Sequence, residues 1–390
     1  MEHPIEALIT KPYRLVIGFM SGTSADGIDA VLAEIYGHGT ATRVKQRDFV
    51  FIPFAPEVRA EILRLASGGS AAAADFCRMN FLLGELYCEA GRELCRHAGV
   101  NKADIDLIGN HGQTFWHIPN EEEYLGHRLR STLQLGEDAM LAEEFSCPVV
   151  GNFRVRDVAA GGLGAPLVPY TEFLLYRSET ECVALQNIGG IGNISFLPAG
   201  CGLDDVLAFD TGPGNMLIDT WTQRITGALY DRDGRWAASG RVSTTLLDDL
   251  LSEPYFALPI PKSTGRELFS PAWLDARLCG HESLPPEDVA RTLVELTART
   301  ITNTVARFAP DAAELYVCGG GVYNKTLMQA IASHFPGLTA TTEALGVPPM
   351  EVEAAAFAWL AERFLASLPG NLPAVTRAAG PRILGALYPR

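Results

Sequence analysis

Apolar and polar residues alternate in short runs near the start of the chain. Residues 14–19 form one apolar run that ends in the small-residue stretch SGTSADG, and residues 28–35 form the next. Two such runs joined by Gly and Ser are typical of a β-hairpin. Residues 56–67 and 74–97 then place apolar side chains at helical spacing. The pattern therefore predicts a hairpin followed by two helices.

A similar order returns later in the chain. Residues 105–109 predict a short strand that runs into NHGQT, before the glycine-rich connection NFRVRDVAAGGLGAPLVP. Residues 181–188 and 194–197 predict a second hairpin around GGIGN, and residues 206–210 predict a strand that breaks at TGPGN. Both halves thus open with a strand, a glycine-rich turn and an antiparallel strand. This repetition predicts an internally duplicated architecture.

The last third of the chain continues the alternation of helices and strands. Residues 289–308 are amphipathic and predict a long helix, residues 315–318 predict a strand running into GGG, and residues 352–368 predict another helix. At 390 residues the chain exceeds the size at which single cores stop growing. The fold class expected is therefore α/β with two domains, divided in the glycine-rich connection near residue 158.

Composition and charge limit the partners and the compartment. The chain is 47% hydrophobic and 20% charged, as in soluble globular proteins, and its formal net charge of -15 disfavours nucleic acid and anionic membranes as partners. The N-terminus has no signal-peptide pattern, and no apolar run approaches a membrane span. Eight cysteines are scattered without metal-ligand spacing, which indicates a reduced, cytoplasmic protein.

Three glycine clusters follow predicted strands: SGTSADG, NIGGIGN at 187–193, and CGGG at 318–321. Successive backbone amides in such turns bind phosphate without a cationic side chain. Any one cluster alone is better explained as a tight turn, but three at strand ends, spread over both halves, favour a nucleotide site. Walker, protein-kinase and dinucleotide-binding motifs are absent from the sequence.

Two further motifs carry polar groups at strand ends. Asp210 in FDTGPGN stands where open α/β sheets place their ligands, as a general base or, alternatively, as the cap of a helix over 215–226. HGQT at 111–114 offers donors and acceptors for a polyhydroxyl ligand, although His111 taken alone is more typical of a core histidine.

Taken together, these motifs resemble a known family. SGTSADGID, HGQT, DVAAGGLGAPLVP, NIGGIGN, FDTGPGN, DGRWAASG, PKSTGRE, CGGGVYN and LGALYP occur in order from residue 17 to 389. The combination resembles the anhydro-N-acetylmuramic acid kinases, which belong to the acetate kinase, sugar kinase, Hsp70 and actin superfamily. The resemblance implies two duplicated actin-like, ribonuclease H-like domains with an inter-domain cleft: residues 1–158, completed by 379–390, and residues 159–378.

The resemblance also implies an activity. It indicates an ATP- and Mg²⁺-dependent enzyme of peptidoglycan recycling that opens the 1,6-anhydro ring with water and phosphorylates O6, giving N-acetylmuramic acid 6-phosphate. A small anhydro amino sugar is the expected partner, and a homodimer the expected assembly. Because ATP arrives with its Mg²⁺, the SGTSADG loop needs no cationic residue of its own.

Site residues follow from the matching motif positions. The resemblance implies an ATP site made of Gly22, Thr23, Ser24, Ala25, Asp26, Gly27, Ile28, Asp29, Asn187, Gly189, Gly190, Asn193, Gly319, Gly320 and Gly321. Asp210 matches the catalytic base. The expected sugar contacts are His111, Gln113, Arg154, Gly212 and Glu353, with Arg154 or Arg156 facing the lactyl carboxylate.

Some positions depart from the pattern of the relatives. Met20 stands where the superfamily favours an aspartate, so Asp26 or Asp29 is expected to support the metal. Asn152, Leu163, Glu137 and Asp138 also differ, on the presumed sugar side. Two alternatives stay open: a kinase of levoglucosan, which has no N-acetyl or lactyl group, and an actin-like regulator that hydrolyses ATP only as a switch.

Overall fold

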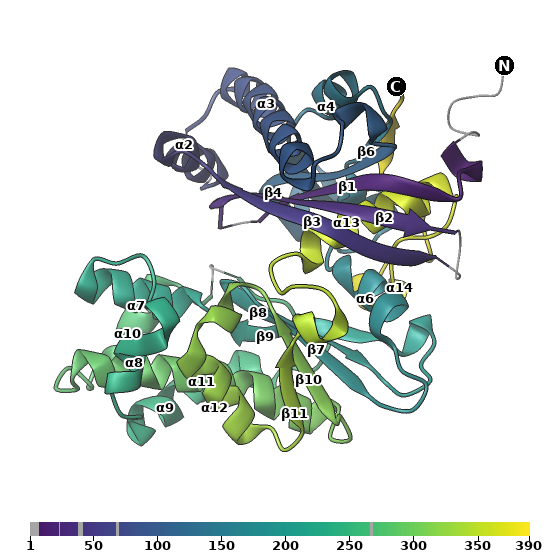
Figure 1. The fold of residues 1–390 in the computed structure, drawn as a ribbon. Helices are drawn as coiled ribbons and strands as arrows, with labels where there is room; N and C mark the ends of the chain where they lie inside the picture. Colours follow the sequence, from purple (N-terminus) through teal and green to yellow (C-terminus); the bar gives the residue numbers. More distant parts are fainter. Residues whose placement is uncertain (1–7, 23, 38–41, 68–69, 266–267) are drawn as a thin grey trace. The chain divides into compact units, whose positions relative to one another are not determined.

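The computed structural model describes residues 8–22, 24–37, 42–67, 70–265 and 268–390 (Figure 1). The chain divides into two compact units: residues 1–174 with 351–390, and residues 175–350. Within the described residues, no helix combines the length and the apolar character needed to cross a membrane.

Unit 1 is built on a seven-stranded sheet in the order β12-β6-β4-β1-β2-β3, with β5 paired to β4. β2 runs antiparallel to both β1 and β3, whereas β4 and β6 run parallel to β1. The strands are β1 (Tyr13–Ser21), β2 (Gly27–Tyr36), β3 (Arg43–Pro53), β4 (Leu107–Tyr124), β5 (His127–Leu135), β6 (Val149–Gly151) and β12 (Ala386–Tyr388).

Helices cover both faces of this sheet. On one face, apolar side chains of α2, α3 and α4 form a core with those of β1 and β2. On the other face α13 lies directly against β1 and β4. Gly18 and Gly109 allow this close approach, since a Cβ at either position would clash with the backbone of α13. The helices are α2 (Pro56–Ala66), α3 (Ala73–Ala98), α4 (Asp138–Phe145), α5 (Phe153–Ala159), α6 (Val168–Tyr176), α13 (Val352–Leu365) and α14 (Pro373–Thr376).

Unit 2 has a five-stranded sheet in the order β11-β10-β7-β8-β9. Its strands are β7 (Val183–Ile188), β8 (Ile191–Leu197), β9 (Leu207–Pro213), β10 (Glu314–Cys318) and β11 (Leu338–Thr341). The long helix α11 contributes apolar side chains from most of its turns to the core of this unit. The helices are α7 (Met216–Thr226), α8 (Arg235–Ser239), α9 (Thr244–Leu251), α10 (Pro271–Leu278), α11 (Pro286–Phe308) and α12 (Lys325–His334).

The two sheets repeat one topology. In unit 1 the order β3-β2-β1-β4-β6 joins three antiparallel strands to two parallel ones, and β9-β8-β7-β10-β11 does the same in unit 2. Parallel neighbours need crossover connections, and helices supply them in both units. The expected α/β class and the duplicated, ribonuclease H-like arrangement are confirmed.

Most expected elements are present, with two differences. HGQT was expected to follow a short strand at 105–109, but it lies inside the 18-residue strand β4, because its residues continue the pairing with β5. The contact-based division of the chain falls at residues 174 and 350, whereas the sequence placed it at 158 and 378. The close packing of α13 on Gly18 and Gly109 explains why residues 351–365 lie with unit 1.

Candidate active site

The loop between β1 and β2 is held in place from β4. The Nε2 of Gln113 donates to the Gly22 carbonyl at 3.0 Å, and its Oε1 lies 2.6 Å from the Ser21 hydroxyl. That hydroxyl is also 2.7 Å from the Gly27 carbonyl, so both ends of the loop are tied to one buried amide. Gln113 was expected to contact the sugar; its engaged amide indicates that it positions the loop.

Two glycines of this loop have different reasons for being glycine. A Cβ at Gly27 would clash with the Ile52 carbonyl of β3, so the fold itself requires glycine there. Among the described residues, a Cβ at Gly22 would meet nothing nearer than the Ser24 hydroxyl at 3.8 Å, and Gly22 does not have the positive φ that favours glycine. Neither packing nor backbone conformation therefore explains why residue 22 is a glycine. Without a side chain, its backbone is accessible to a ligand.

The remaining loop residues divide between core and surface. The side chains of Ala25 and Ile28 are buried in the core, so only their backbone is available to a ligand. The Ser24 hydroxyl donates to the Asp26 carboxylate at 2.7 Å on the exposed side. Thr23 lies outside the described residues. The expected phosphate loop is thus a backbone surface with one exposed carboxylate beside it.

A second carboxylate lies across from Met20. Strand pairing sets Asp29 of β2 directly opposite Met20 of β1, and its Oδ1 is buried without a hydrogen-bond partner among the described residues. Burial, followed by the charge of Glu353, raises the pKa of Asp29 to about 8. An unpartnered carboxylate oxygen beside Asp26 and Glu353 is an environment that a cation stabilises.

Arg154 and His111 form a buried polar pair on the α13 side of the sheet. The Nε of Arg154 donates to Nε2 of His111 at 2.8 Å, and its Nη1 donates to the Gly164 carbonyl at 2.8 Å. His111 Nδ1 therefore carries the proton and donates to the Gly112 carbonyl at 2.7 Å. Burial, assisted by the charge of Arg154, holds the pKa of His111 well below its usual range. His111 is thus a neutral support for Arg154.

Glu353 stands in the first turn of α13. Burial raises the pKa of its carboxyl, while the charge of Arg154 opposes that rise. Burial lowers the pKa of Arg154 to about 10, so it stays protonated at neutral pH. Arg154 is accordingly a cation held next to a carboxyl group, suited to a ligand that carries its own carboxylate. Arg156, the alternative cation, is exposed.

Sequence reasoning missed the residues that hold this segment of β4. The Asn110 Nδ2 donates to Oδ1 of Asp138 at 2.7 Å, and the Asn110 Oδ1 accepts from the Gly112 amide at 3.1 Å. Through Asn110, Asp138 is therefore connected to the backbone amide of Gly112, which lies between His111 and Gln113. No local pattern signals this pairing, because Asn110 and Asp138 are 28 residues apart.

In unit 2, strand register brings three of the expected residues into one row. Asn187 of β7 lies opposite Asn193 of β8, which in turn lies opposite Asp210 of β9. Directly paired residues share one face of a sheet, so the three side chains are neighbours. This row borders the GGIGN turn, and Cys318 of β10 extends it toward the third glycine cluster.

The GGIGN turn and the TGPGN turn form one backbone unit. The amides of Gly214 and Asn215 donate to the carbonyls of Gly190 and Gly189 at 2.9 and 2.8 Å, and a Cβ at Gly214 would clash with Gly189. Yet among the described residues a Cβ at Gly189 would meet nothing nearer than the Ile191 carbonyl oxygen at 3.5 Å, one at Gly190 nothing nearer than 3.8 Å, and neither residue has a positive φ. Gly212 differs, since its φ of 139° and its contact with Phe256 require glycine.

The third cluster begins the 3₁₀ turn Gly320–Tyr323. Gly319 has a φ of 79° and its amide donates to the Pro349 carbonyl at 3.0 Å. A Cβ at Gly319 or Gly321 would clash with Asn187 or Ile188, whereas the nearest described atom to a Cβ at Gly320 would be the Asn215 Nδ2 at 3.9 Å. Each of the three clusters therefore contains at least one glycine that neither a clash with the described residues nor a positive φ requires.

The Asp210 carboxylate is anchored by Ser263 and Thr264 of the PKSTGRE motif. Its Oδ2 accepts from the Ser263 hydroxyl at 2.8 Å and from the Thr264 amide at 2.9 Å, and its own amide donates to the Lys262 carbonyl at 3.1 Å. The alternative role as a helix cap is excluded, because α7 begins at Met216 and its N-cap is Asn215. The Ser263 hydroxyl and the Thr264 amide therefore fix the orientation of the Asp210 carboxylate.

A buried lysine supports the same segment. The Lys262 Nζ donates to the carbonyls of Tyr255 and Phe256, each at 3.1 Å, and the Tyr255 hydroxyl donates to the Asp210 carbonyl at 2.8 Å. Burial lowers the pKa of Lys262 to about 8. The motif PKSTGRE was visible in the sequence, but its contact with Asp210, 53 residues away, was not.

Among the described residues, no group of three or more His, Cys, Asp or Glu side chains is arranged to hold a metal ion.

Solved structures with a similar arrangement share little sequence with the chain. An activator of 2-hydroxyisocaproyl-CoA dehydratase from Clostridium difficile with bound ADPNP aligns with a TM-score of 0.46 at 10% identity, over 90% of this chain and 96% of that one. A ROK family glucokinase from Streptomyces griseus, in complex with glucose and AMPPNP, aligns with a TM-score of 0.37 at 12% identity, over 90% and 99%.

Sequence relatives are much closer. Anhydro-N-acetylmuramic acid kinases from Caldanaerobacter subterraneus subsp. tengcongensis and Burkholderia orbicola are 45% and 46% identical to the chain. The alignments span 97% of the chain and 98% of the first relative, and 96% of both the chain and the second. The family model described as anhydro-N-acetylmuramic acid kinase matches residues 14–390. The chain therefore belongs to the anhydro-N-acetylmuramic acid kinase family.

Proposed function

We propose that the chain is an ATP-dependent kinase that opens the 1,6-anhydro ring of anhydro-N-acetylmuramic acid with water and phosphorylates O6. The product is N-acetylmuramic acid 6-phosphate, an intermediate of peptidoglycan recycling. The observation that carries the proposal is the family match over residues 14–390. The contacts within each unit support the separate roles described below.

The nucleotide is assigned to the glycine clusters. Gly22, Gly189, Gly190 and Gly320 have room for a Cβ and no positive φ, so a ligand that approaches the backbone is the reason that remains for glycine. Backbone amides at such turns stabilise phosphate oxygens without formal charge. Mg²⁺ bound to ATP would add the positive charge that stabilises the phosphoryl group during transfer, and Asp29 and Asp26 are the carboxylates suited to hold it.

The general base is assigned to Asp210. In the anhydro sugar O6 is an ether oxygen without a proton, so the base must act on water. Asp210 takes a proton from water as the water oxygen bonds to C1 and the C1–O6 bond breaks. The released O6 bonds to the γ-phosphorus, and ADP leaves. Ser263 and Thr264 orient the carboxylate through one oxygen, Oδ2.

The sugar contacts are assigned to Arg154 and Glu353. Arg154 is the cation proposed to face the lactyl carboxylate, since His111 and Gly164 hold it rigidly and burial strengthens its attraction for an anion. Glu353 is the proposed acceptor for a sugar hydroxyl. We further propose a cytoplasmic homodimer as the functional state.

Two measurements test this function. In ¹⁸O-labelled water, the label is expected on C1 of the sugar product and not in its phosphate. Turnover of anhydro-N-acetylmuramic acid and of levoglucosan is then compared, because a polar site that binds the lactyl carboxylate discriminates strongly against a sugar without it. Label in the phosphate ester would refute the ring-opening chemistry, and equal kcat/KM for the two sugars would refute the substrate.

Asp210→Asn tests the base directly. The variant keeps the shape of the side chain but cannot accept the proton, so kcat is expected to fall by about 10²–10⁴-fold with ATP affinity unchanged. Asp204→Asn, at an exposed aspartate of the same unit, is the matched control. Near-normal turnover by Asp210→Asn would remove Asp210 from the role of base.

A further inference from the structure

The HGQT segment begins with an irregularity in β4. Asn110 and Gln113 both pair with β1, but two residues lie between them on β4 and only Met20 lies between their partners. The extra residue makes His111 and Gly112 a β-bulge, which we call the β4 bulge, and Gly112 has a φ of 76°. A bulge leaves a residue outside the regular ladder of backbone hydrogen bonds. The conformation of the β4 bulge therefore depends on other contacts.

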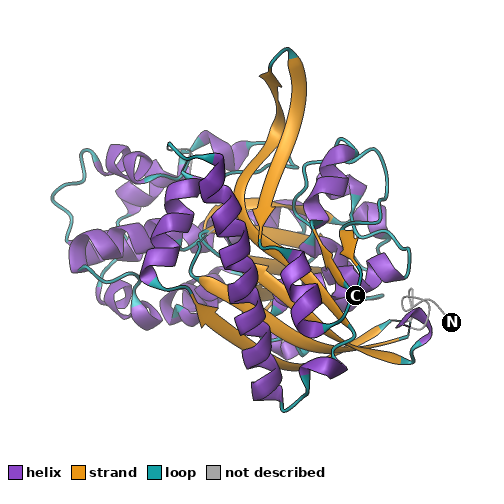
Figure 2. Ribbon diagram, turned by 90° about the horizontal axis from the view of Figure 1, so that it is seen from above, coloured by secondary structure: helices purple, strands orange, loops and turns teal. Residues whose placement is uncertain are grey.

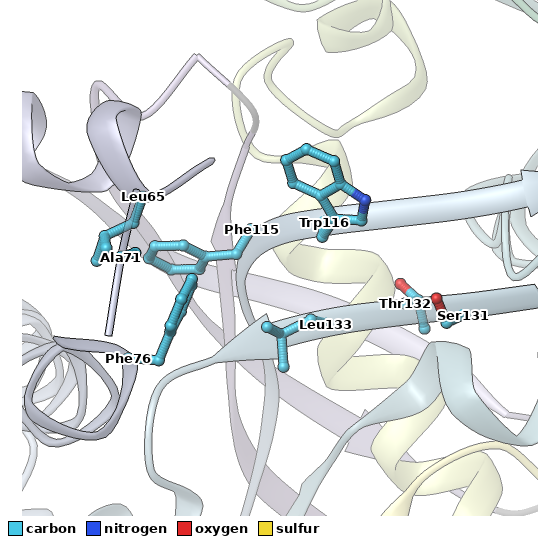
Figure 3. A pocket seen from close by; sticks show the side chains of 8 residues that line it. All are labelled: Leu65, Ala71, Phe76, Phe115, Trp116, Ser131, Thr132 and Leu133. Carbon is cyan, nitrogen blue, oxygen red and sulfur yellow. The ribbon is translucent and has the colours of Figure 1, made fainter. Parts of the chain in front are cut away.

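The strand on either side of the β4 bulge is fixed. After the bulge, β4 pairs with β5 and continues into a long two-stranded ribbon with a tight turn at its end (Figure 2). At the base of this ribbon the Phe115 ring packs against Phe76, with ring centroids 6.1 Å apart, beside Leu65 (Figure 3). Before the bulge, Asn110 is buried and pairs with both β1 and β6. The bulge is thus the adjustable part of this segment.

A chain of hydrogen bonds, which we call the Asp138 relay, runs through the β4 bulge to Arg154. Oδ1 of Asp138 accepts from Asn110 Nδ2 at 2.7 Å, and Oδ1 of Asn110 accepts from the Gly112 amide at 3.1 Å. Nδ1 of His111 donates to the Gly112 carbonyl at 2.7 Å, and Nε2 of His111 accepts from Arg154 Nε at 2.8 Å. Every link lies within unit 1. The orientation of the Arg154 guanidinium is therefore connected to the Asp138 carboxyl group.

The charge of Asp138 decides which way the Asn110 amide points. A carboxylate can only accept, so it holds Nδ2 of Asn110 toward itself and leaves Oδ1 of Asn110 for the Gly112 amide. The contact of the same Nδ2 with the Gly136 carbonyl is longer, at 3.3 Å, and is the weaker restraint. A protonated Asp138 has a hydroxyl that can donate to Oδ1 of Asn110. The amide can then turn over, which sets Nδ2 against the Gly112 N–H, two donors without an acceptor.

We propose that Asp138 is a positioning residue for the sugar: its carboxylate fixes the Asn110 amide and the β4 bulge, and thereby holds Arg154 in the orientation that binds the carboxylate of the sugar. In this role Asp138 acts through Asn110 and not by contact with the sugar. The inference rests on the proposed function, which assigns Arg154 to the lactyl carboxylate. None of the motifs that resemble the family contains Asp138.

The surroundings of Asp138 also favour a role in the site. The groups that face it from α3, α4, β4, β6 and β12 are neutral or acidic: Asn110, Gly151, Glu137, Tyr87 and Tyr388. Burial raises the pKa of Asp138 to about 7, opposed by the Asn110 hydrogen bond. At pH 8 the ionised carboxylate therefore costs the fold stability. A carboxylate at such a position, connected to a ligand-binding cation, is typical of a functional site.

The pH dependence of KM tests the inference on the full chain. KM for anhydro-N-acetylmuramic acid is expected to rise as pH falls from 8 to 6, because protonation of Asp138 releases the Asn110 amide, whereas KM for ATP should not follow this step. Loss of one hydrogen bond in the relay corresponds to about tenfold in affinity. Asp138→Asn cannot ionise, so its KM for the sugar is expected to exceed that of wild type about tenfold at pH 8 and about twofold at pH 6, with kcat nearly unchanged.

Further variants separate positioning from other effects. Asp104→Asn, at an exposed aspartate of unit 1, is the control and should match wild type at both pH values. Groups that titrate in both proteins, such as Asp29, cancel in the ratio of the two KM values. Asn110→Ser removes the link between Asp138 and the β4 bulge, so adding Asp138→Asn to it should raise KM no further.

A readout without turnover checks the relay itself. In the ¹H–¹⁵N correlation spectrum, the Gly112 amide of wild type should shift with a midpoint near pH 7, and the same amide in Asp138→Asn should not. Failure of the kinase function would appear as absence of turnover at every pH and would leave this titration intact. A KM ratio that is equal at pH 6 and pH 8, a Gly112 amide that titrates alike in both proteins, or an additive double variant would overturn the inference.

Discussion

Asp138→Asn is expected to make the protein more stable at pH 8 and to leave its stability at pH 4 nearly unchanged. Asp138 is the first residue of α4, and its carboxylate packs against Gly151 and accepts from Asn110. Burial raises the pKa of Asp138 to about 7, opposed by the Asn110 hydrogen bond and assisted by Glu137. The buried phenol of Tyr87 and the partly exposed phenol of Tyr388 also interact with this charge.

The sign follows from the raised pKa in the folded state. The unfolded side chain titrates near 3.8, and the folded one near 7. Below the unfolded pKa both states are protonated, and burial of Asp138 costs no charge desolvation. As pH rises through the folded pKa that advantage is lost. A difference of about three units corresponds to about 4 kcal/mol of unfolding free energy, since each unit is worth about 1.4 kcal/mol.

The amide of the variant resembles the neutral acid at every pH. It keeps an acceptor for Asn110, and the folded pKa of about 7 already includes the stronger hydrogen bond that Asn110 makes to the charged form. Asp138→Asn is therefore expected to gain about 4 kcal/mol over wild type at pH 8, and almost none at pH 4. Other buried carboxyls with raised pKa values, such as Asp29, change both proteins equally and cancel in the difference.

Urea unfolding of variant and wild type across this pH range is the assay, with the midpoint and slope followed for the transition of unit 1. Asp204→Asn, at an exposed position, is the control and should show no pH-dependent difference. A difference between Asp138→Asn and wild type that is the same at pH 4 and pH 8 would refute the reasoning. So would a variant that is less stable than wild type at pH 8.

Three further outcomes are expected. Gly22→Val should abolish calorimetric binding of Mg·ATP and leave the fold intact, because the position has room for a side chain. Gly27→Val should instead fail to fold, because its side chain would clash with β3. Unchanged affinity for Mg·ATP in Gly22→Val would show that the loop is not part of the nucleotide site. Ser263→Ala should lower kcat, because it removes one of the two hydrogen bonds that hold the Asp210 carboxylate, and should leave KM for ATP unchanged, because Ser263 is not an expected nucleotide contact. An unaltered kcat would show that the Thr264 amide alone is sufficient to hold Asp210. A thiol reagent should titrate two cysteines in the native protein and eight after unfolding, because only Cys77 and Cys279 are exposed; a third fast thiol would show that a buried one opens.

Local patterns were sufficient for much of the fold. The hairpins β1–β2 and β7–β8 and the helices α2, α3 and α11 were predicted because their apolar periodicity and their terminating glycines lie within a few residues of each other. The same holds for the turns at the strand ends, where the open glycines Gly22, Gly189 and Gly320 are found. The order of motifs along the chain also identified the family before any contact was known.

What the sequence left undecided depends on pairing between distant segments. β4 continues through the polar residues of HGQT because β5 pairs with it, and α13 joins unit 1 because Gly18 and Gly109 admit its backbone. The supports of the site are equally non-local: Asp138 holds Asn110 from 28 residues away, and Ser263 holds Asp210 from 53. Periodicity reports which face of an element is apolar, but not which distant element covers it. Tertiary packing decided those partners, and with them the orientation of the side chains at the candidate site.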